Sequence, residues 1–75
     1  MSALETYLEH RPAMLAAAFR ITGSRAEAED VVQETWERWE RVDGEQIASP
    51  RAYLCVMASR LALNALRTQR RRRER

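Results

Sequence analysis

The sequence predicts an all-α fold, a compact bundle of three helices that forms a single domain over residues 1–75. Apolar residues recur at three- and four-residue spacing along most of the chain, which is the period of a helix with one buried face. No segment alternates between apolar and polar residues with the period of a strand. The chain has only two glycines and two prolines, and three of these four residues stand where a helix is expected to begin or end.

The first helix is expected over residues 3–22. Its apolar face consists of Leu4, Leu8, Leu15, Ala18 and Thr22. Pro12 lies inside this helix and has no backbone N–H, so we expect it either to kink the helix or to split off the first two turns. Gly23 follows at the position where a left-handed C-cap is expected.

The second helix begins at a capping box formed by Ser24 and Glu27, and we expect it to continue to about Arg41. Its apolar arc consists of Ala28, Val31, Val32, Thr35, Trp36 and Trp39. We interpret both tryptophans as core residues. Residues 42–48 contain the pair Asp43-Gly44, which is typical of a turn, so this segment is expected to form a loop.

The third helix begins at Ser49 and Pro50, an N-cap followed by proline at the first helical position, and should reach about Arg70. One narrow face carries Tyr53, Arg60, Asn64, Arg67 and Arg71, opposite a broad apolar arc. Arginine and asparagine can contact phosphates and base edges, and an aromatic ring can stack on an unpaired base. The pattern therefore favours a nucleic-acid-binding face over an ordinary solvated face.

Charge divides the chain into two halves. Residues 1–48 hold five arginines against ten acidic residues, whereas residues 49–75 hold eight arginines against one. This split suggests one basic and one acidic partner. Residues 70–75 form a basic tail that should add salt-dependent attraction to phosphate. The acidic face of the second helix has a simpler interpretation, because Glu34 with Arg38 and Glu37 with Arg41 have the spacing of ordinary ion pairs, and the pattern alone favours that interpretation.

Several function classes find little support in these residues. The single cysteine excludes an intrachain disulfide and suggests a reducing compartment. His10 is the only histidine and has no second ligand at metal spacing, so we expect no metal and no cofactor. No catalytic set and no phosphate-binding glycine loop is present, which indicates that the chain is not an enzyme. The apolar stretches are too short to span a bilayer, so we expect a cytoplasmic protein.

Four segments, in this order, resemble region 2 of the extracytoplasmic-function group of sigma-70-type bacterial transcription initiation factors. They are residues 7–12 (YLEHRP), 22–36 (TGSRAEAEDVVQETW), 49–54 (SPRAYL) and 60–67 (RLALNALR). The resemblance covers nearly the whole chain, and residues 28–36 are its most specific part. The form of residues 51–54, with Arg60 following, is similar to the subgroup that carries an extra C-terminal domain.

The resemblance implies a role for each charged half. It implies that the acidic face docks on the coiled coil of the RNA polymerase beta-prime clamp through Asp30, Gln33 and Glu34, and Glu37 on the same polar face is predicted to join them. It implies that residues 49–67 bind the minus-ten promoter element as duplex and as non-template single strand, with the contact residues Arg51, Tyr53, Arg60, Asn64 and Arg67. Arg71, further along the same stripe, is predicted to extend this contact. The loop over residues 42–49 is expected to hold a flipped base, with Asp43, Gly44 and Ser49 around it. An anti-sigma factor is a further expected partner.

The sequence departs from the common family pattern at three positions of the third helix. Tryptophan is usual at Tyr53, asparagine is frequent at Arg60, and aspartate is frequent at Asn64, which leaves the base preference open. The domain that reads the minus-thirty-five element is absent, so we expect either a fragment or a protein that cannot initiate alone at ordinary promoters. Two alternatives are a protein-interaction module that docks on polymerase without reading DNA and, less favoured, an amphipathic helix at a membrane surface.

Overall fold

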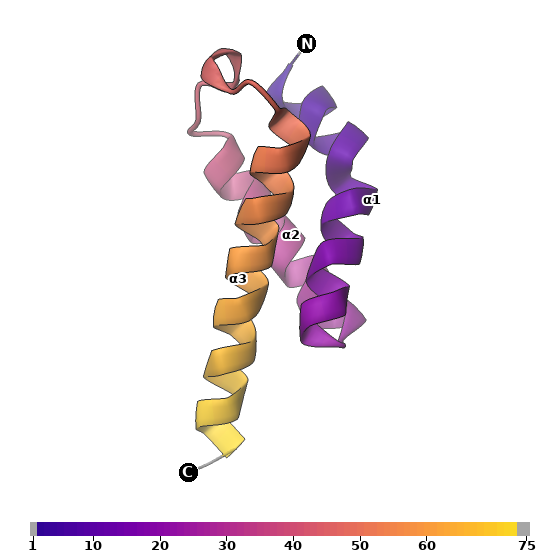
Figure 1. Cartoon of the computed structure of the whole chain (residues 1–75), viewed down its shortest axis with the longest axis vertical. Helices are drawn as coiled ribbons and strands as arrows, with labels where there is room; N and C mark the ends of the chain where they lie inside the picture. The colour runs from indigo at the N-terminus through magenta and orange to yellow at the C-terminus, as the bar shows by residue number, and fades with distance from the viewer. Residues whose placement is uncertain (1, 74–75) are drawn as a thin grey trace.

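The computed structural model describes residues 2–73, which fold into three α-helices and one short 3-10 helix. Helix α1 spans Ala3–Thr22, α2 spans Arg25–Trp39, η1 spans Gly44–Gln46 and α3 spans Pro50–Arg73. No strand occurs within this described range, so the predicted all-α bundle is confirmed. The three helices lie side by side, and the C-terminal turns of α3 extend beyond the other two helices (Figure 1).

Local capping contacts form at the helix ends where the sequence predicted them. The Ser49 hydroxyl accepts a hydrogen bond from the Ala52 N–H at 3.3 Å and so caps α3. Gly23 has a φ of +66°, and its N–H donates to the Phe19 carbonyl at 2.8 Å. A left-handed residue without a Cβ closes a helix in this way at little cost. The C-terminal end of α1 and the start of α3 are therefore set by short-range chemistry.

The capping box at the start of α2 is only half formed. The Ser24 hydroxyl accepts a hydrogen bond from the Glu27 N–H at 3.3 Å, as expected. The Ser24 N–H, however, donates to the Thr22 hydroxyl at 3.3 Å rather than to the Glu27 side chain. The Glu27 Oε2 atom is consequently buried without a hydrogen-bond partner. This orphaned oxygen lies at the edge of a hollow described below.

Three expected helix boundaries need correction. Helix α1 is not split at Pro12 but continues through it. The missing hydrogen bond frees the Leu8 carbonyl, and both Leu8 and Pro12 are exposed, so water can satisfy that carbonyl. Helix α2 ends at Trp39 rather than near Arg41, because its last turn tightens into bonds between residues three apart.

Helix α3 continues to Arg73, three residues past the expected end at Arg70. The basic tail expected over residues 70–75 is thus helical for its first four residues. Residues 74 and 75 of that tail lie outside the described residues.

The core lies along the line where the three helices meet. Met14 and Ala18 of α1, Val32 of α2, and Leu54 and Ala58 of α3 are all fully buried. Their mixture of large and small side chains lets the helices approach closely and fill the space between them.

Two aromatic side chains of the core tie α1 to α2 by hydrogen bonds. The Tyr7 hydroxyl donates to the Val32 carbonyl at 3.2 Å, and the Trp39 indole N–H donates to the Ala3 carbonyl at 3.0 Å. The Trp36 ring packs against Tyr7 with the ring centroids 5.0 Å apart. The interpretation of both tryptophans as packing residues is confirmed.

The apolar face expected on α1 is buried only in its C-terminal half. Ala18 is fully buried and Leu15 packs against the core, as expected. Leu4 and Leu8, however, are 50% and 53% exposed, whereas Tyr7 and Met14, which were not on the expected face, turn to the core. Two apolar rows run along this helix with the same spacing, a fraction of a turn apart. The periodicity alone could not decide which row would meet α2 and α3. Within the described residues, no helix combines the length and apolarity needed to cross a bilayer.

Candidate nucleic-acid groove and acidic hollow

The loop between α2 and α3 folds back onto the end of α2. The Asp43 carboxylate accepts a hydrogen bond from the Glu45 N–H at 3.2 Å and so starts η1. Gly44 lies against the Trp39 indole, because a Cβ added there would stand 3.3 Å from the Cζ2 atom of that ring. Trp39 is held in turn by its hydrogen bond to Ala3. Trp39, which also contacts Tyr53 of α3, therefore holds the loop in place against the other helices.

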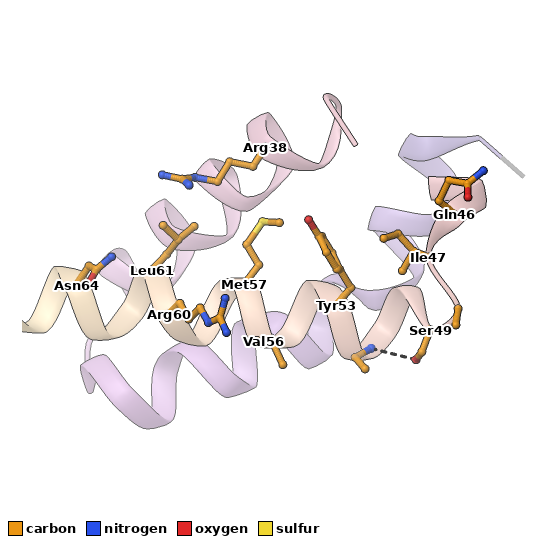
Figure 2. A pocket seen from close by; sticks show the side chains of 12 residues that line it. Arg38, Gln46, Ile47, Ser49, Tyr53, Val56, Met57, Arg60, Leu61 and Asn64 are labelled. Carbon is orange, nitrogen blue, oxygen red and sulfur yellow. Dashed lines mark hydrogen bonds between the residues drawn. The ribbon is translucent and has the colours of Figure 1, made fainter. Parts of the chain in front are cut away.

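This loop and the facing sides of α2 and α3 enclose a groove, seen from close by in Figure 2. The groove has a volume of about 740 Å³, within the range of about 300–1,000 Å³ typical of small-ligand sites. It is lined by Arg38, Gln46, Ile47, Ala48, Ser49, Ala52, Tyr53, Val56, Met57, Arg60, Leu61 and Asn64. Four of the residues predicted to contact DNA, namely Ser49, Tyr53, Arg60 and Asn64, thus line one groove.

The groove combines apolar walls with polar groups at its edges. Ile47, Tyr53, Val56 and Met57 supply apolar surface, and Val56 is 50% exposed. Arginine, asparagine and glutamine side chains stand around them (Figure 2). A base has two apolar faces and a polar edge, and its backbone is anionic, so one nucleotide matches this mixture.

Tyr53 stands in the groove but is not the exposed ring that its place on the polar stripe predicted. It is half-buried, and its ring contacts Trp39 with the centroids 5.8 Å apart and the planes tilted by 50°. This contact presents part of the ring to the groove while the rest belongs to the periphery of the core. The prediction missed the contact because it links the end of α2 to the first turn of α3.

The arginines of the predicted stripe divide into two groups. Arg60 lines the groove together with Asn64. Arg67 and Arg71 are exposed further along α3 and lie outside the groove. Arg51 is exposed in the first turn of α3 and also lies outside it. Arg67 and Arg71 therefore extend the positively charged surface of α3 beyond the end of the groove.

The loop residues expected around a flipped base are also divided. Ser49 lines the groove, where its hydroxyl is engaged with the Ala52 N–H (Figure 2). Gly44 instead lines a second hollow of about 340 Å³ on the other side of the loop. Asp43 lines neither hollow, and its carboxylate is occupied by the Glu45 N–H.

Sequence reasoning did not name most of the other residues that line the groove, and three of them bear on its chemistry. Gln46 and Ile47 come from the part of the loop between the predicted pair at Asp43 and the predicted Ser49. Arg38 comes from α2, where it was interpreted as an ion-pair partner of Glu34. The sequence offers little to indicate them, because Ile47 is one of several apolar residues in the loop over residues 42–49.

A third hollow, of about 310 Å³, lies between α2 and α3 and is acidic; it is called the acidic hollow below. It is lined by Glu27, Asp30, Val31, Glu34, Leu61, Ala65 and Thr68. Two of the residues predicted to bind polymerase, Asp30 and Glu34, therefore lie in it, next to the orphaned oxygen of Glu27. The other two, Gln33 and Glu37, are exposed on α2 outside the hollow.

The simpler interpretation of this acidic face does not hold. Among the described residues the only ion pair is Arg25–Glu29, with Nε and Oε1 3.2 Å apart. The expected pairs of Glu34 with Arg38 and of Glu37 with Arg41 are not formed. Asp30, Glu34 and Glu37 thus form no ion pair with an arginine of the described residues, and only Glu29 is paired within α2. The described residues also contain no cluster of three or more metal-binding side chains.

Comparison with known proteins identifies the family. The sequence profile of Sigma-70 region 2 matches residues 6–72. The chain is 45% identical over 74 residues to the ECF RNA polymerase sigma factor SigJ of Mycobacterium tuberculosis strain ATCC 25618 / H37Rv, covering 99% of this chain and 22% of that protein. It is 39% identical over 66 residues to the probable ECF RNA polymerase sigma factor SigI of the same species, covering 88% and 23%.

The chain belongs to the sigma-70 region 2 family, within the extracytoplasmic-function group of sigma factors. The resemblance seen in the sequence is thereby confirmed. The chain spans about a fifth of the length of the curated relatives that it matches. No solved structure matches it.

Proposed function

We propose that this domain acts in transcription initiation by holding an unpaired stretch of the minus-ten promoter element in the α2–α3 groove. The observation that carries the proposal is the convergence of Ser49, Tyr53, Arg60 and Asn64 on one groove with apolar walls. Ser49 lies in the loop before α3, and the other three residues lie on α3. The chain belongs to a family whose members act as initiation factors. Arg67 and Arg71, further along α3, extend the contact to the neighbouring phosphates.

Capture of a base in the groove provides a way to open the duplex without a catalytic step. Unstacking one base costs a few kcal/mol, and stacking on an aromatic ring contributes about 1–3 kcal/mol per base. The half-buried Tyr53 ring is braced against Trp39, so it meets a base without losing further side-chain freedom. The domain then stabilises the open strand rather than driving the opening by chemistry.

We propose that the acidic face of α2 binds the clamp of RNA polymerase. Asp30 and Glu34 share a hollow, and neither forms an ion pair with an arginine of the described residues. Glu27 lines the same hollow and adds a third carboxylate to it. A site with several carboxylates favours arginine, whose planar group donates several hydrogen bonds.

The direct test is the binding of single-stranded DNA by wild type and by Arg60→Ala, measured by fluorescence anisotropy at several salt concentrations. We expect Arg60→Ala to bind about tenfold more weakly, as loss of a hydrogen bond between charged groups implies. The slope of log affinity against log salt should fall by about 0.7, the value for one phosphate contact on a single strand.

Arg20→Ala is the matched control, because Arg20 is also exposed but lies on α1 outside the groove. It should leave both the affinity and the salt slope unchanged. Equal effects of the two substitutions would show that only net charge matters, and the proposed role of the groove would be wrong.

A second candidate function is a protein-interaction module that docks on polymerase, or is held by an anti-sigma factor, without reading DNA. The acidic hollow supports this candidate, because docking through Asp30 and Glu34 requires no contact with DNA. The two functions are separated by comparing promoter-like with scrambled single strands. A reader of the minus-ten element prefers the former, whereas an interaction module shows no preference.

A further inference from the structure

Arg38 is the part of the groove that comes from α2. Its side chain is exposed, and it lines the groove opposite the α3 residues Arg60 and Asn64. Figure 2 shows its guanidinium extended above Leu61 toward the Asn64 end of the groove. The other arginine of α2, Arg25, borders a separate hollow beside α1. The groove therefore has a cationic group on each of its two long walls.

The Arg38 guanidinium has no ion-pair partner among the described residues. Glu34, one helical turn away, has the spacing for a pair but lines the acidic hollow instead. An exposed arginine pair of this kind contributes only a few tenths of a kcal/mol even when it forms. Binding an external anion therefore costs this side chain no internal contact.

The chemistry around Arg38 favours a phosphate rather than a base. Figure 2 shows its guanidinium on the side of Leu61 and Asn64, which lie at the end of the groove away from Tyr53 and Ile47. If a base occupies the aromatic and aliphatic end, the adjoining backbone runs past the other end. A guanidinium binds two oxygens of a phosphate at once, which an ammonium cannot do with the same geometry.

We propose that Arg38 binds a backbone phosphate of an unpaired DNA strand that lies in the groove, so that α2 and α3 hold the strand from both sides. This inference rests on the proposed function of the groove. It assigns α2 a second task beside its acidic face. The strand is then fixed by Arg38 and Arg60 across the groove rather than by α3 alone.

The test compares Arg38→Gln with Arg41→Gln in the 75-residue chain. Arg41 is the matched control, because it is exposed three residues further along and borders neither the groove nor the acidic hollow. The probe is a fluorescent pool of single-stranded DNA of about 12 nucleotides, within the site sizes of single-strand-binding folds. Circular dichroism establishes that each variant keeps the helical content of wild type.

We expect Arg38→Gln to weaken binding about tenfold and to lower the salt slope by about 0.7, with Arg41→Gln close to wild type. Arg38→Lys should restore the salt slope but only part of the affinity, because it keeps the charge and loses the bidentate geometry. If Arg38→Gln equals Arg41→Gln while Arg60→Ala still binds weakly, the Arg38 assignment is wrong and the groove stands. If wild type fails to bind the pool, both proposals are wrong.

A methylphosphonate scan locates the contact. In a strand selected from the pool, one linkage at a time is made neutral. Wild type should lose affinity at a particular linkage where Arg38→Gln shows no further loss, because the same contact has already been removed. Equal losses in both proteins at every linkage would overturn the assignment.

Discussion

The groove and the acidic hollow are neighbouring parts of one crevice between α2 and α3, yet their polar residues have opposite charge. Leu61 lines both of them. On one side of it stand Arg38 and Arg60, and on the other side stand Asp30 and Glu34. One helical turn of α2 separates Glu34 from Arg38. A domain of three helices can thus present two different partners with complementary surfaces without a second core.

The comparison also shows how differently the two regions are built. The groove depends on a loop that Trp39 holds in place, so it combines residues from distant parts of the sequence. The acidic hollow depends on two helices alone and on side chains spaced at three and four residues along α2. A loop can vary while the helices stay the same. If the groove holds DNA as proposed, we expect substitutions in the loop to change DNA preference with little effect on the acidic face.

The largest expected effect comes from truncating Leu61, the side chain that lines both the groove and the acidic hollow. Leu61 is 8% exposed, and we expect Leu61→Ala to lower the free energy of unfolding by about 2–4 kcal/mol. DNA binding and clamp binding should decline together, because both hollows lose the same wall. Urea denaturation followed by circular dichroism measures the stability.

Leu63→Ala is the control for that substitution, because Leu63 lies two residues away on α3 and is 41% exposed. It should cost less than about 1 kcal/mol. If Leu61→Ala is as stable as Leu63→Ala, Leu61 is not the packing residue on which both hollows depend.

An intermediate effect is expected from a substitution that separates the two regions. Asp30→Ala should weaken binding to a polymerase clamp fragment about tenfold and leave single-stranded DNA binding unchanged. Gln33→Ala should have a smaller effect, because Gln33 lies outside the hollow and is uncharged. Isothermal titration calorimetry with the clamp fragment measures both.

Glu40→Gln serves as the control for charge, since Glu40 is exposed just after α2 and away from the hollow. Its affinity for the clamp should match wild type. An unchanged clamp affinity in Asp30→Ala would remove the basis for assigning the acidic face to polymerase.

The smallest effect is expected from Tyr53→Phe. The Tyr53 ring contacts Trp39, and no hydrogen bond to its hydroxyl is formed within the described part of the chain. The substitution should change the free energy of unfolding by less than about 0.5 kcal/mol. It should change DNA affinity by less than about twofold if stacking, not the hydroxyl, is the contact.

Tyr53→Ala provides the contrast, because it removes the ring and leaves a gap beside Trp39. It should weaken DNA binding by about tenfold or more. A large loss in Tyr53→Phe would instead assign the hydroxyl to base recognition.

Much of this domain could be predicted from local sequence because local forces decide it. Ser49 and Gly23 set helix ends through contacts within a few residues. The acidic residues Asp30 and Glu34 share a helix face through their spacing alone. The prediction failed where two solutions have the same period, as with Leu4 and Tyr7 on α1.

The site was harder to predict than the fold because its residues meet across elements. Asp43 and Gly44 looked like pocket residues, but their turn chemistry and the Trp39 contact direct them elsewhere. Arg38 looked like half of an ion pair, but an exposed pair of this kind is too weak to hold it. No pattern within α2 indicates that it faces Arg60 across a groove.

The sequence by itself determined the all-α class, the helix starts, the separation of charge and the family. These properties depend on neighbours within one or two helical turns, or on the order of motifs along the chain. Tertiary structure alone decided which row of α1 is buried, that Tyr53 packs on Trp39, and that the α2–α3 crevice changes charge at Leu61. These outcomes depend on how the helices rotate and pack to fill a shared core, which no single segment specifies.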